Sequence, residues 1–113
     1  GLSFENINDF LLKLVFKNCT MNLSSFYDKD MKGASFENCN LSEVDFAHAD
    51  LSKVSLCDSN LSQAVFDNTN LSEADLRGSY DFIINPENSN IRKAKFTRDS
   101  IAGLLTQYNI LIS

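Results

Sequence analysis

The sequence predicts an all-β solenoid, in which short extended segments wind one after another around a shared core. A large apolar residue recurs every five positions from Leu11 to Leu76, and again from Ile91 to Ile101. Two places before it stands a small residue, and immediately before it Asp or Asn dominates. Neither a helix of 3.6 residues per turn nor a strand of period two keeps positions five apart on one face. The chain must therefore make a short extended piece, turn, and repeat.

Each five-residue unit reads small, Asp or Asn, large, polar, polar. The small and the large residue are two apart, so both point inward on an extended segment. The inner residue is small because a narrow coil must also hold Leu or Phe. Asp and Asn side chains bind nearby backbone groups and stabilise turns, which gives the second position a physical role.

The units ASFEN, CNLSE, VDFAH, ADLSK, SNLSQ, AVFDN, TNLSE and ADLRG resemble the pentapeptide-repeat family. The resemblance is strong over about residues 14–79, where every unit from Met31 to Leu76 keeps an apolar centre. It implies a right-handed quadrilateral β-helix with four units per coil, so that residues twenty apart stack. The sequence then predicts a core ladder of Phe16, Phe36, Leu56, Leu76, Phe26, Phe46, Phe66, Leu41, Leu61, Leu51 and Leu71.

Five segments are expected along the chain. Residues 1–15 form either a degenerate first coil or a short amphipathic cap, and residues 16–79 form the β-helix. Residues 80–90 form a loop or irregular side, because Asp81 and Pro86 fall where apolar residues belong, and proline breaks a ladder. The last repeats occupy residues 91–98. Residues 99–113 form a short helix and then a β-prone strand.

By the same resemblance, this carboxyl-terminal segment caps the open end of the coil and can carry a homodimer contact. An open stack would otherwise leave edge groups and core exposed. The candidate cap and dimer residues are Ile101, Leu104, Leu105, Ile110 and Ile112.

Composition narrows the classes of function. The 113 residues suffice for one domain, and the net charge of −5 argues against direct nucleic-acid binding, which needs basic patches. No apolar run is long enough to span a membrane. Three cysteines without a CxxC pair favour neither a disulfide framework nor zinc, and they suggest reduced thiols in a cytoplasm. A start at Gly1 would also fit a fragment of a longer repeat protein.

The chemically reactive side chains form no catalytic or metal constellation. Cys19 and Cys39 take the small inner position one coil apart, where a disulfide is conceivable by distance but packing is favoured. Cys57 should face solvent, and His48 is the single histidine, in an outward position. We therefore expect no catalytic residue, no metal and no cofactor.

Carboxylates make the remaining candidate site, an acidic interaction surface. Stacking at twenty residues would place Asp30 under Asp50 on one side of the coil. The alternative is a set of solvated turn residues, with Lys53 and Glu73 on adjacent coils as a compensating pair. The candidate acidic residues are Asp30, Asp45, Asp50, Asp67 and Asp75.

These observations predict a non-enzymatic scaffold or protein-interaction module whose partner the sequence does not name. The alternative comes from the resemblance, since some pentapeptide-repeat proteins protect DNA gyrase from quinolones. An acidic rod could act as a DNA mimic that binds such a topoisomerase. An enzyme using a surface carboxylate or Cys57 is a third class, for which no constellation exists.

Overall fold

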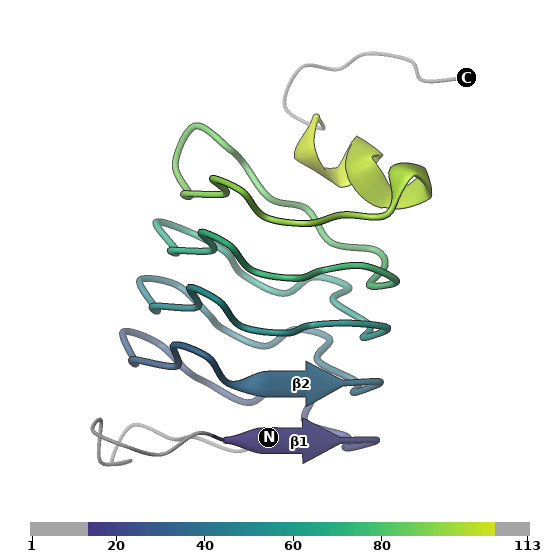
Figure 1. Cartoon of the computed structure of the whole chain (residues 1–113). Helices are drawn as coiled ribbons and strands as arrows, with labels where there is room; N and C mark the ends of the chain where they lie inside the picture. Colours follow the sequence, from purple (N-terminus) through teal and green to yellow (C-terminus); the bar gives the residue numbers. More distant parts are fainter. Residues whose placement is uncertain (1–13, 106–113) are drawn as a thin grey trace.

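The computed structural model describes residues 14–105 and winds them into a stack of coils that rises along one axis (Figure 1). Parallel β-bridges join residues twenty positions apart, from Thr20 and Asn40 to Asp75 and Lys95. Among these residues, only β1 (Val15–Lys17) and β2 (Ser35–Glu37) form a regular parallel sheet. The predicted β solenoid is confirmed, because each coil pairs with the next through its backbone.

Most corners of the coil are tight turns that follow a core residue and are closed by a backbone hydrogen bond. The Ser24 N–H donates to the Met21 carbonyl oxygen at 3.1 Å, and Leu23 between them has φ 65°. A positive φ at the second central residue is the type II pattern. The same conformation recurs every five residues through most of the coil, at Asn18, Leu23, Asp28, Asn38, Glu43, His48, Lys53, Asp58, Gln63, Asn68 and Glu73, with Gly33 and Gly78 in phase.

The Asp or Asn before a core residue fastens the turn that follows. Asp50 Oδ1 accepts the Ser52 N–H at 3.0 Å, and Asn60 Oδ1 accepts the Ser62 N–H at 2.9 Å. This is the Asx turn, in which a short side chain substitutes for a backbone acceptor. The same bond forms at Asp30, Asn40, Asp45, Asn70, Asp75 and Asn90.

The core is a set of stacked columns of apolar side chains. The Phe26 and Phe46 rings lie 5.5 Å apart and the Phe46 and Phe66 rings 5.4 Å apart, at interplanar angles of 10° and 15°. Phe16 stacks on Phe36 at 5.0 Å but is only half-buried. The other residues of the expected ladder are all buried: Phe36, Leu56, Leu76, Phe26, Phe46, Phe66, Leu41, Leu61, Leu51 and Leu71.

Buried hydroxyls join two of the corners to the coil that follows. Ser59 Oγ accepts the Cys39 N–H at 3.1 Å and donates to the Phe36 carbonyl oxygen at 3.1 Å. Ser89 Oγ likewise accepts the Thr69 N–H at 3.2 Å and donates to the Phe66 carbonyl oxygen at 2.8 Å. In each case one oxygen bridges a donor and an acceptor that do not bond to each other.

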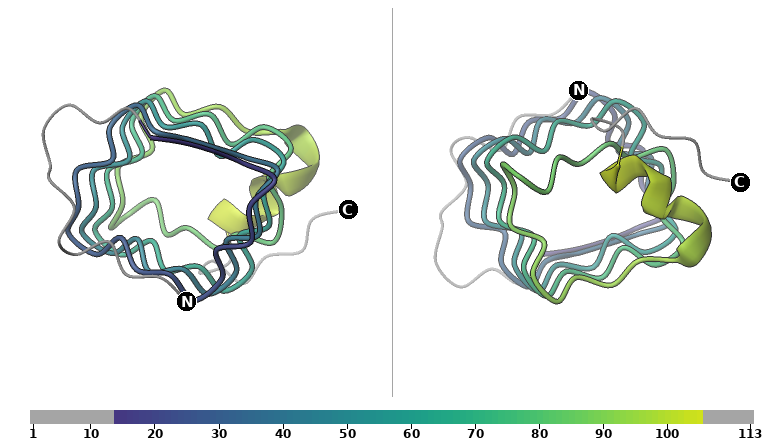
Figure 2. Two further views of the ribbon diagram at one scale, coloured as in Figure 1. Left: turned by 90° about the horizontal axis from the view of Figure 1, so that it is seen from below. Right: turned by 90° about the horizontal axis from the view of Figure 1, so that it is seen from above.

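The last coil departs from the outline of those beneath it. Tyr80 pairs with Asn60 and Asn90 with Asn70, but among the described residues no bridge forms between these two points. The intervening segment runs inside the outline of the lower coils (Figure 2) and buries Phe82 and Ile84. Residues 82–84 therefore lie across the mouth of the core.

The helix η1 (Arg98–Leu104) is a 3-10 helix beyond the last coil (Figure 1). Ile84 N–H donates to the Gly103 carbonyl oxygen at 3.0 Å, and Leu104 packs against the core. Within residues 14–105 no helix has the length and apolarity to cross a membrane. The expected amino-terminal coil or cap, apart from Leu14 and Val15, and the expected carboxyl-terminal strand lie outside the described residues.

Candidate interaction surface

Two of the five candidate carboxylates come together. Asp30 pairs with Asp50 by a β-bridge, and the same column continues through Asn70 and Asn90. Each of these side chains accepts the backbone N–H two residues ahead, so part of its hydrogen-bonding capacity serves its own turn. The column presents carboxylates from two coils and amides from the next two.

The remaining three candidate carboxylates lie at other positions around the coil. Asp45 is half-buried and accepts the Ala47 N–H at 2.9 Å. Asp67 is exposed, and its Oδ1 accepts the Asn88 Nδ2 hydrogen at 3.2 Å from one coil later. The five acidic residues therefore do not form one continuous patch.

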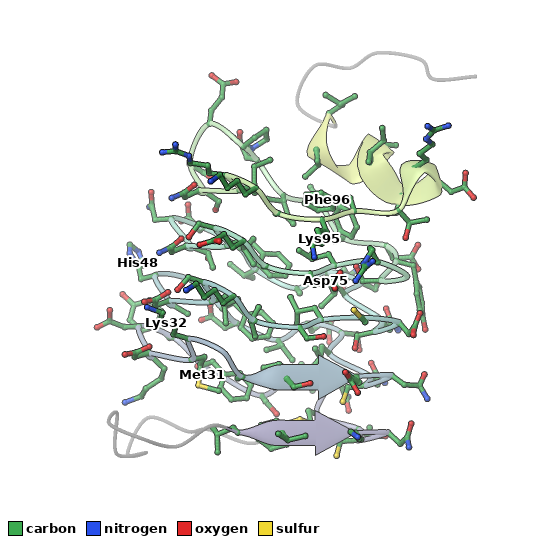
Figure 3. All side chains as sticks on the ribbon, viewed as in Figure 1. Met31, Lys32, His48, Asp75, Lys95 and Phe96 are labelled. Atoms are coloured by element: carbon green, nitrogen blue, oxygen red, sulfur yellow. The ribbon has the colours of Figure 1, made fainter. Side chains whose placement is uncertain are left out.

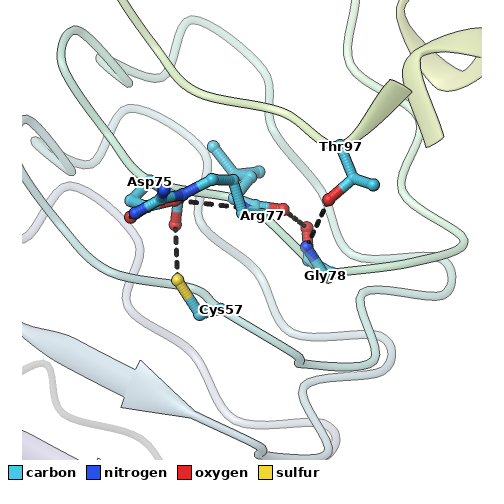
Figure 4. A network of polar contacts seen from close by, with 7 residues as sticks. Cys57, Asp75, Arg77, Gly78 and Thr97 are labelled. Atoms are coloured by element: carbon cyan, nitrogen blue, oxygen red, sulfur yellow. Dashed lines mark hydrogen bonds and ion pairs between the residues drawn. The ribbon is translucent and has the colours of Figure 1, made fainter. Parts of the chain in front are cut away.

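Asp75 is neutralised by a neighbour in its own turn. Arg77 Nη2 lies 2.7 Å from Asp75 Oδ2, and Arg77 Nε donates to Oδ1 at 2.9 Å (Figure 4). These hydrogen bonds to the guanidinium lower the pKa of Asp75 to about 2. The expected pair of Lys53 and Glu73 does not form: both side chains are described, and no ion pair joins them.

The cysteines are free thiols. Cys39 is buried, and Cys19 and Cys57 are half-buried. Cys57 Sγ donates to the Asp75 backbone oxygen at 3.8 Å, and burial raises the pKa of the Cys57 thiol. Burial likewise raises the pKa of the Cys39 thiol. Neither thiol is activated toward the thiolate, the nucleophilic form.

His48 lies at the outer edge of the stack (Figure 3). Its ring contacts Tyr27 edge-on, with centroids 5.4 Å apart. Within the described ranges no three His, Cys, Asp or Glu side chains cluster as metal ligands would. His48 and Tyr27 instead give the outer face an aromatic contact area.

A shallow polar hollow of about 300 Å³ lies along one corner of the stack, between Asn18 and Tyr80. Asn38 Nδ2 donates to Asn18 Oδ1 at 2.7 Å across adjacent coils. Sequence reasoning did not single out these asparagines, although their twenty-residue separation could have indicated the contact. The hollow offers amide groups for polar contacts, and the free thiols of Cys19 and Cys39 also belong to its lining.

The candidate cap and dimer residues divide by exposure. Ile101 is 42% exposed, whereas Leu104 and Leu105 are half-buried. Ile110 and Ile112 lie outside the described residues. Ile83, 61% exposed, adds an apolar side chain in the segment that lies across the core.

A family described as a pentapeptide repeat region matches residues 29–105. Among solved structures, the chain is similar to HetL from the cyanobacterium Nostoc sp. strain PCC 7120, a protein involved in the regulation of heterocyst differentiation. The TM-score is 0.62 at 13% identity, over 75% of this chain and 44% of HetL, so this chain spans less than half of that protein's length.

Two further structures align at lower scores. Full-length QnrB1, a plasmid-mediated fluoroquinolone resistance protein, aligns with a TM-score of 0.33 at 14% identity, over 88% of this chain and 70% of QnrB1. A pentapeptide repeat protein from the Arabidopsis thaliana thylakoid lumen aligns with a TM-score of 0.35 at 20% identity, over 74% of this chain and 61% of that one. No curated protein sequence matches the chain.

Proposed function

This chain belongs to the pentapeptide-repeat family, and from that membership we propose that it is a non-enzymatic scaffold that binds a protein partner. The observation that carries the proposal is that different positions of each five-residue unit have different structural roles. Inner residues fill the core and Asx side chains fasten turns, as Leu51 and Asp50 do. The exposed positions have neither role, so their side chains are free to vary. They project from a backbone that hydrogen bonds to the coils above and below hold in place.

We further propose the finer architecture that the family suggests. Each twenty-residue coil is a right-handed, four-sided turn of β-helix over residues 16–79, with an irregular side at 80–90 and last repeats at 91–98. The segment 99–113 caps the stack and carries the contact of a homodimer, with exposed Ile101 as one contributor. The free thiols suit a reducing compartment such as the cytoplasm.

Affinity capture from an extract of the native cell tests the scaffold proposal. The wild-type chain is expected to retain a stoichiometric partner, and a variant with outward charges reversed at Glu43, Asp67 and Glu73 is expected to lose it. Equal melting temperatures of the two proteins serve as the control for folding. Retention of the same proteins by wild type, by the variant and by heat-unfolded chain would contradict the proposal.

A second candidate function is a DNA mimic that binds DNA gyrase. The observation that favours it is the charge of the central coils: residues 37–75 hold eight carboxylates and one lysine, a net charge of −7. Exposed carboxylates such as Glu43, Asp67 and Glu73 would stand in for phosphates. A supercoiling assay with and without the protein tests it, with inhibition expected. Unchanged supercoiling and unchanged quinolone-induced cleavage would remove this candidate.

A further inference from the structure

The wall of the solenoid is hydrogen-bonded from coil to coil between residues 43–48 and 62–68. Glu43 N–H donates to Ser62 O at 2.8 Å, Phe46 N–H to Val65 O at 2.9 Å, and His48 N–H to Asp67 O at 2.9 Å. In return, Val65 N–H donates to Val44 O at 2.9 Å. These four bonds are the backbone hydrogen-bond pattern by which one coil pairs with the next on this side.

One coil later the equivalent bonds are missing. The N–H groups of Gln63, Phe66 and Asn68 and the carbonyl oxygen of Ala64 have no hydrogen-bond partner within residues 14–105. Unpaired backbone groups of this kind bind either water or another chain. We call residues 62–68 the open rim.

The open rim results from the path of the segment that follows Tyr80. This segment leaves the wall and runs inside the outline of the coils, where Phe82 and Ile84 fill the core (Figure 2). Ile84 N–H then bonds to Gly103 O, at the end of η1. The chain rejoins the wall at Ser89, whose hydroxyl reaches Phe66 O. The last coil thus closes the core but leaves a strand-length gap in the wall.

We propose that the open rim binds an extended segment of a partner protein, which adds to the wall as a parallel strand. This inference rests on the proposed scaffold function and names the surface that would carry it. The coil beneath gives the required pattern. The incoming strand must offer a carbonyl at its first position, an N–H and a carbonyl at its fourth, and a carbonyl at its sixth, as Ser62, Val65 and Asp67 do for the coil below. Such strand addition is an established mode of peptide recognition.

The side chains around the rim specify the chemistry of the incoming strand. Its third and fifth positions would point inward, where Phe82 and Ile84 already occupy the core, so they must be small. Its fourth position would lie over Val65, which is 44% exposed and favours an apolar residue. Its sixth position would lie over exposed Asp67, where Lys or Arg would replace the hydrogen bond that Asn88 Nδ2 now donates to Asp67 Oδ1. The partner segment therefore reads small, apolar, small, basic.

A capped heptapeptide, Ser-Gln-Ala-Val-Ala-Lys-Asn, provides the probe, with amide hydrogen exchange followed by NMR. In the protein alone, the Phe66 amide is expected to exchange faster than the paired Phe46 amide. Added peptide is expected to shift the Gln63 and Phe66 amide signals and to slow their exchange. The matched control peptide carries N-methylvaline, which cannot donate to Ala64 O, and should bind about tenfold more weakly.

Two protein variants of equal charge change separate the rim from general electrostatics. Asp67→Lys is expected to weaken peptide binding about tenfold, because it places like charges opposite one another. Glu37→Lys alters a different side of the stack and is expected to leave binding unchanged. Equal weakening by both variants would overturn the proposal, since attraction to the overall acidic charge would then explain binding.

Three other results would also overturn it: no signal change at Gln63 and Phe66, equal binding of the N-methyl peptide, or full protection of the Phe66 amide without peptide. Full protection would mean that the chain itself or a second copy already fills the rim, and its dependence on protein concentration would tell these apart. A partner that is still captured by the Asp67→Lys variant would leave the scaffold function standing while removing the rim as its binding site.

Discussion

At the scale of single residues, the inner small position has two kinds of occupant. Ala34, Ala49 and Ala74 only leave room for their larger neighbours, and all three are buried. Ser59 and Ser89 are also buried, but their hydroxyls bridge a donor and an acceptor of the preceding coil. At these two positions the serine therefore contributes hydrogen bonds between coils as well as small size.

Ser59→Ala should destabilise the fold more than the loss of one oxygen atom alone would suggest. The substitution leaves the Cys39 N–H and the Phe36 carbonyl without their bridge in a buried place, which costs about 1–3 kcal/mol in the free energy of unfolding. Urea denaturation measures the loss. Ser42→Ala, at a half-exposed turn position, is the matched control and should change the free energy by less than about 0.5 kcal/mol. Equal effects of the two substitutions would contradict the role of the bridge.

Arg77→Ala should raise the pKa of Asp75 from about 2 toward the ordinary value of 3.8, because the guanidinium hydrogen bonds are its main cause. A carboxylate whose pKa is lowered by folding stabilises the protein fully at pH values above its ordinary pKa of 3.8. That contribution is lost as the pH falls through about 2. Since Arg77 is largely exposed and solvent screens the pair, we expect only a small loss in the free energy of unfolding at neutral pH. The difference from wild type should vanish in strong acid.

NMR titration of the Asp75 carboxyl carbon checks the pKa, and denaturation at neutral and at acid pH checks the linkage. Arg98→Ala, an exposed arginine with no ion pair in the described part of the chain, is the control. An unchanged Asp75 titration in Arg77→Ala would show that another group sets the pKa.

At the scale of the elements, η1 is positioned by the close approach of its last turn to the segment beneath. A Cβ built on Gly103 would lie 2.1 Å from the Phe82 carbonyl oxygen and 2.9 Å from its ring. Both are fixed, because the carbonyl is backbone and Phe82 is buried. The absent side chain therefore permits the helix to lie against residues 82–84.

Gly103→Ala should lift η1 from the stack while leaving the coils intact. The hydrogen bond from Ile84 N–H to Gly103 O should lengthen or break, so that the Ile84 amide exchanges faster. The Val54 amide, which bonds to Leu51 O well inside the stack, should exchange at its former rate. Gly33→Ala is the control: its new Cβ meets nothing within 4 Å, but its φ of 76° strains the alanine, so it should destabilise its own turn and leave exchange at Ile84 unchanged. Unchanged exchange at Ile84 in Gly103→Ala would contradict this account of the close approach.

At the scale of the whole molecule, stability is a sum over coils and the contacts between neighbours. Phe46 is sandwiched between Phe26 and Phe66 and is fully buried. Phe96, near the end of the stack, is only half-buried. The central layers should therefore contribute most to the cooperativity of unfolding.

Phe46→Ala should cost about 3–5 kcal/mol in the free energy of unfolding, because it leaves a cavity in the middle of the ring column. Phe96→Ala should cost roughly half as much, because less of its ring is removed from water. Thermal and chemical denaturation give both values. A larger effect of Phe96→Ala would indicate that the end of the stack, rather than its middle, governs stability.

Much of this fold could be predicted from the sequence, because the five-residue period of large apolar residues determines which side chains form the core. Every fifth residue marks the core, and the family resemblance supplies the stacking of residues such as Phe26, Phe46 and Phe66. The path of residues 81–88 could not be predicted in the same way. Asp81 and Pro86 signal that the period fails, but only packing shows that Phe82 and Ile84 move inward instead.

The candidate site was less predictable than the fold. Asp30, Asp45, Asp50 and Asp75 each accept a backbone N–H of their own turn. Whether such a carboxylate is free or neutralised depends on its neighbours, as Arg77 shows for Asp75. The bridging hydroxyl of Ser59 and the unpaired groups of the open rim arise between coils, and no local pattern encodes them.

The inward path of residues 82–84 also limits how a gene for this protein could grow. Duplicating the codons for one complete coil, such as residues 41–60, would insert one more coil into the stack without changing residues 81–88. Duplicating a span that includes residues 81–88 would place a second inward segment in the middle of the solenoid, where the next coil could not pair with it. Lineages that lengthen this chain should therefore carry their extra codons upstream of Tyr80.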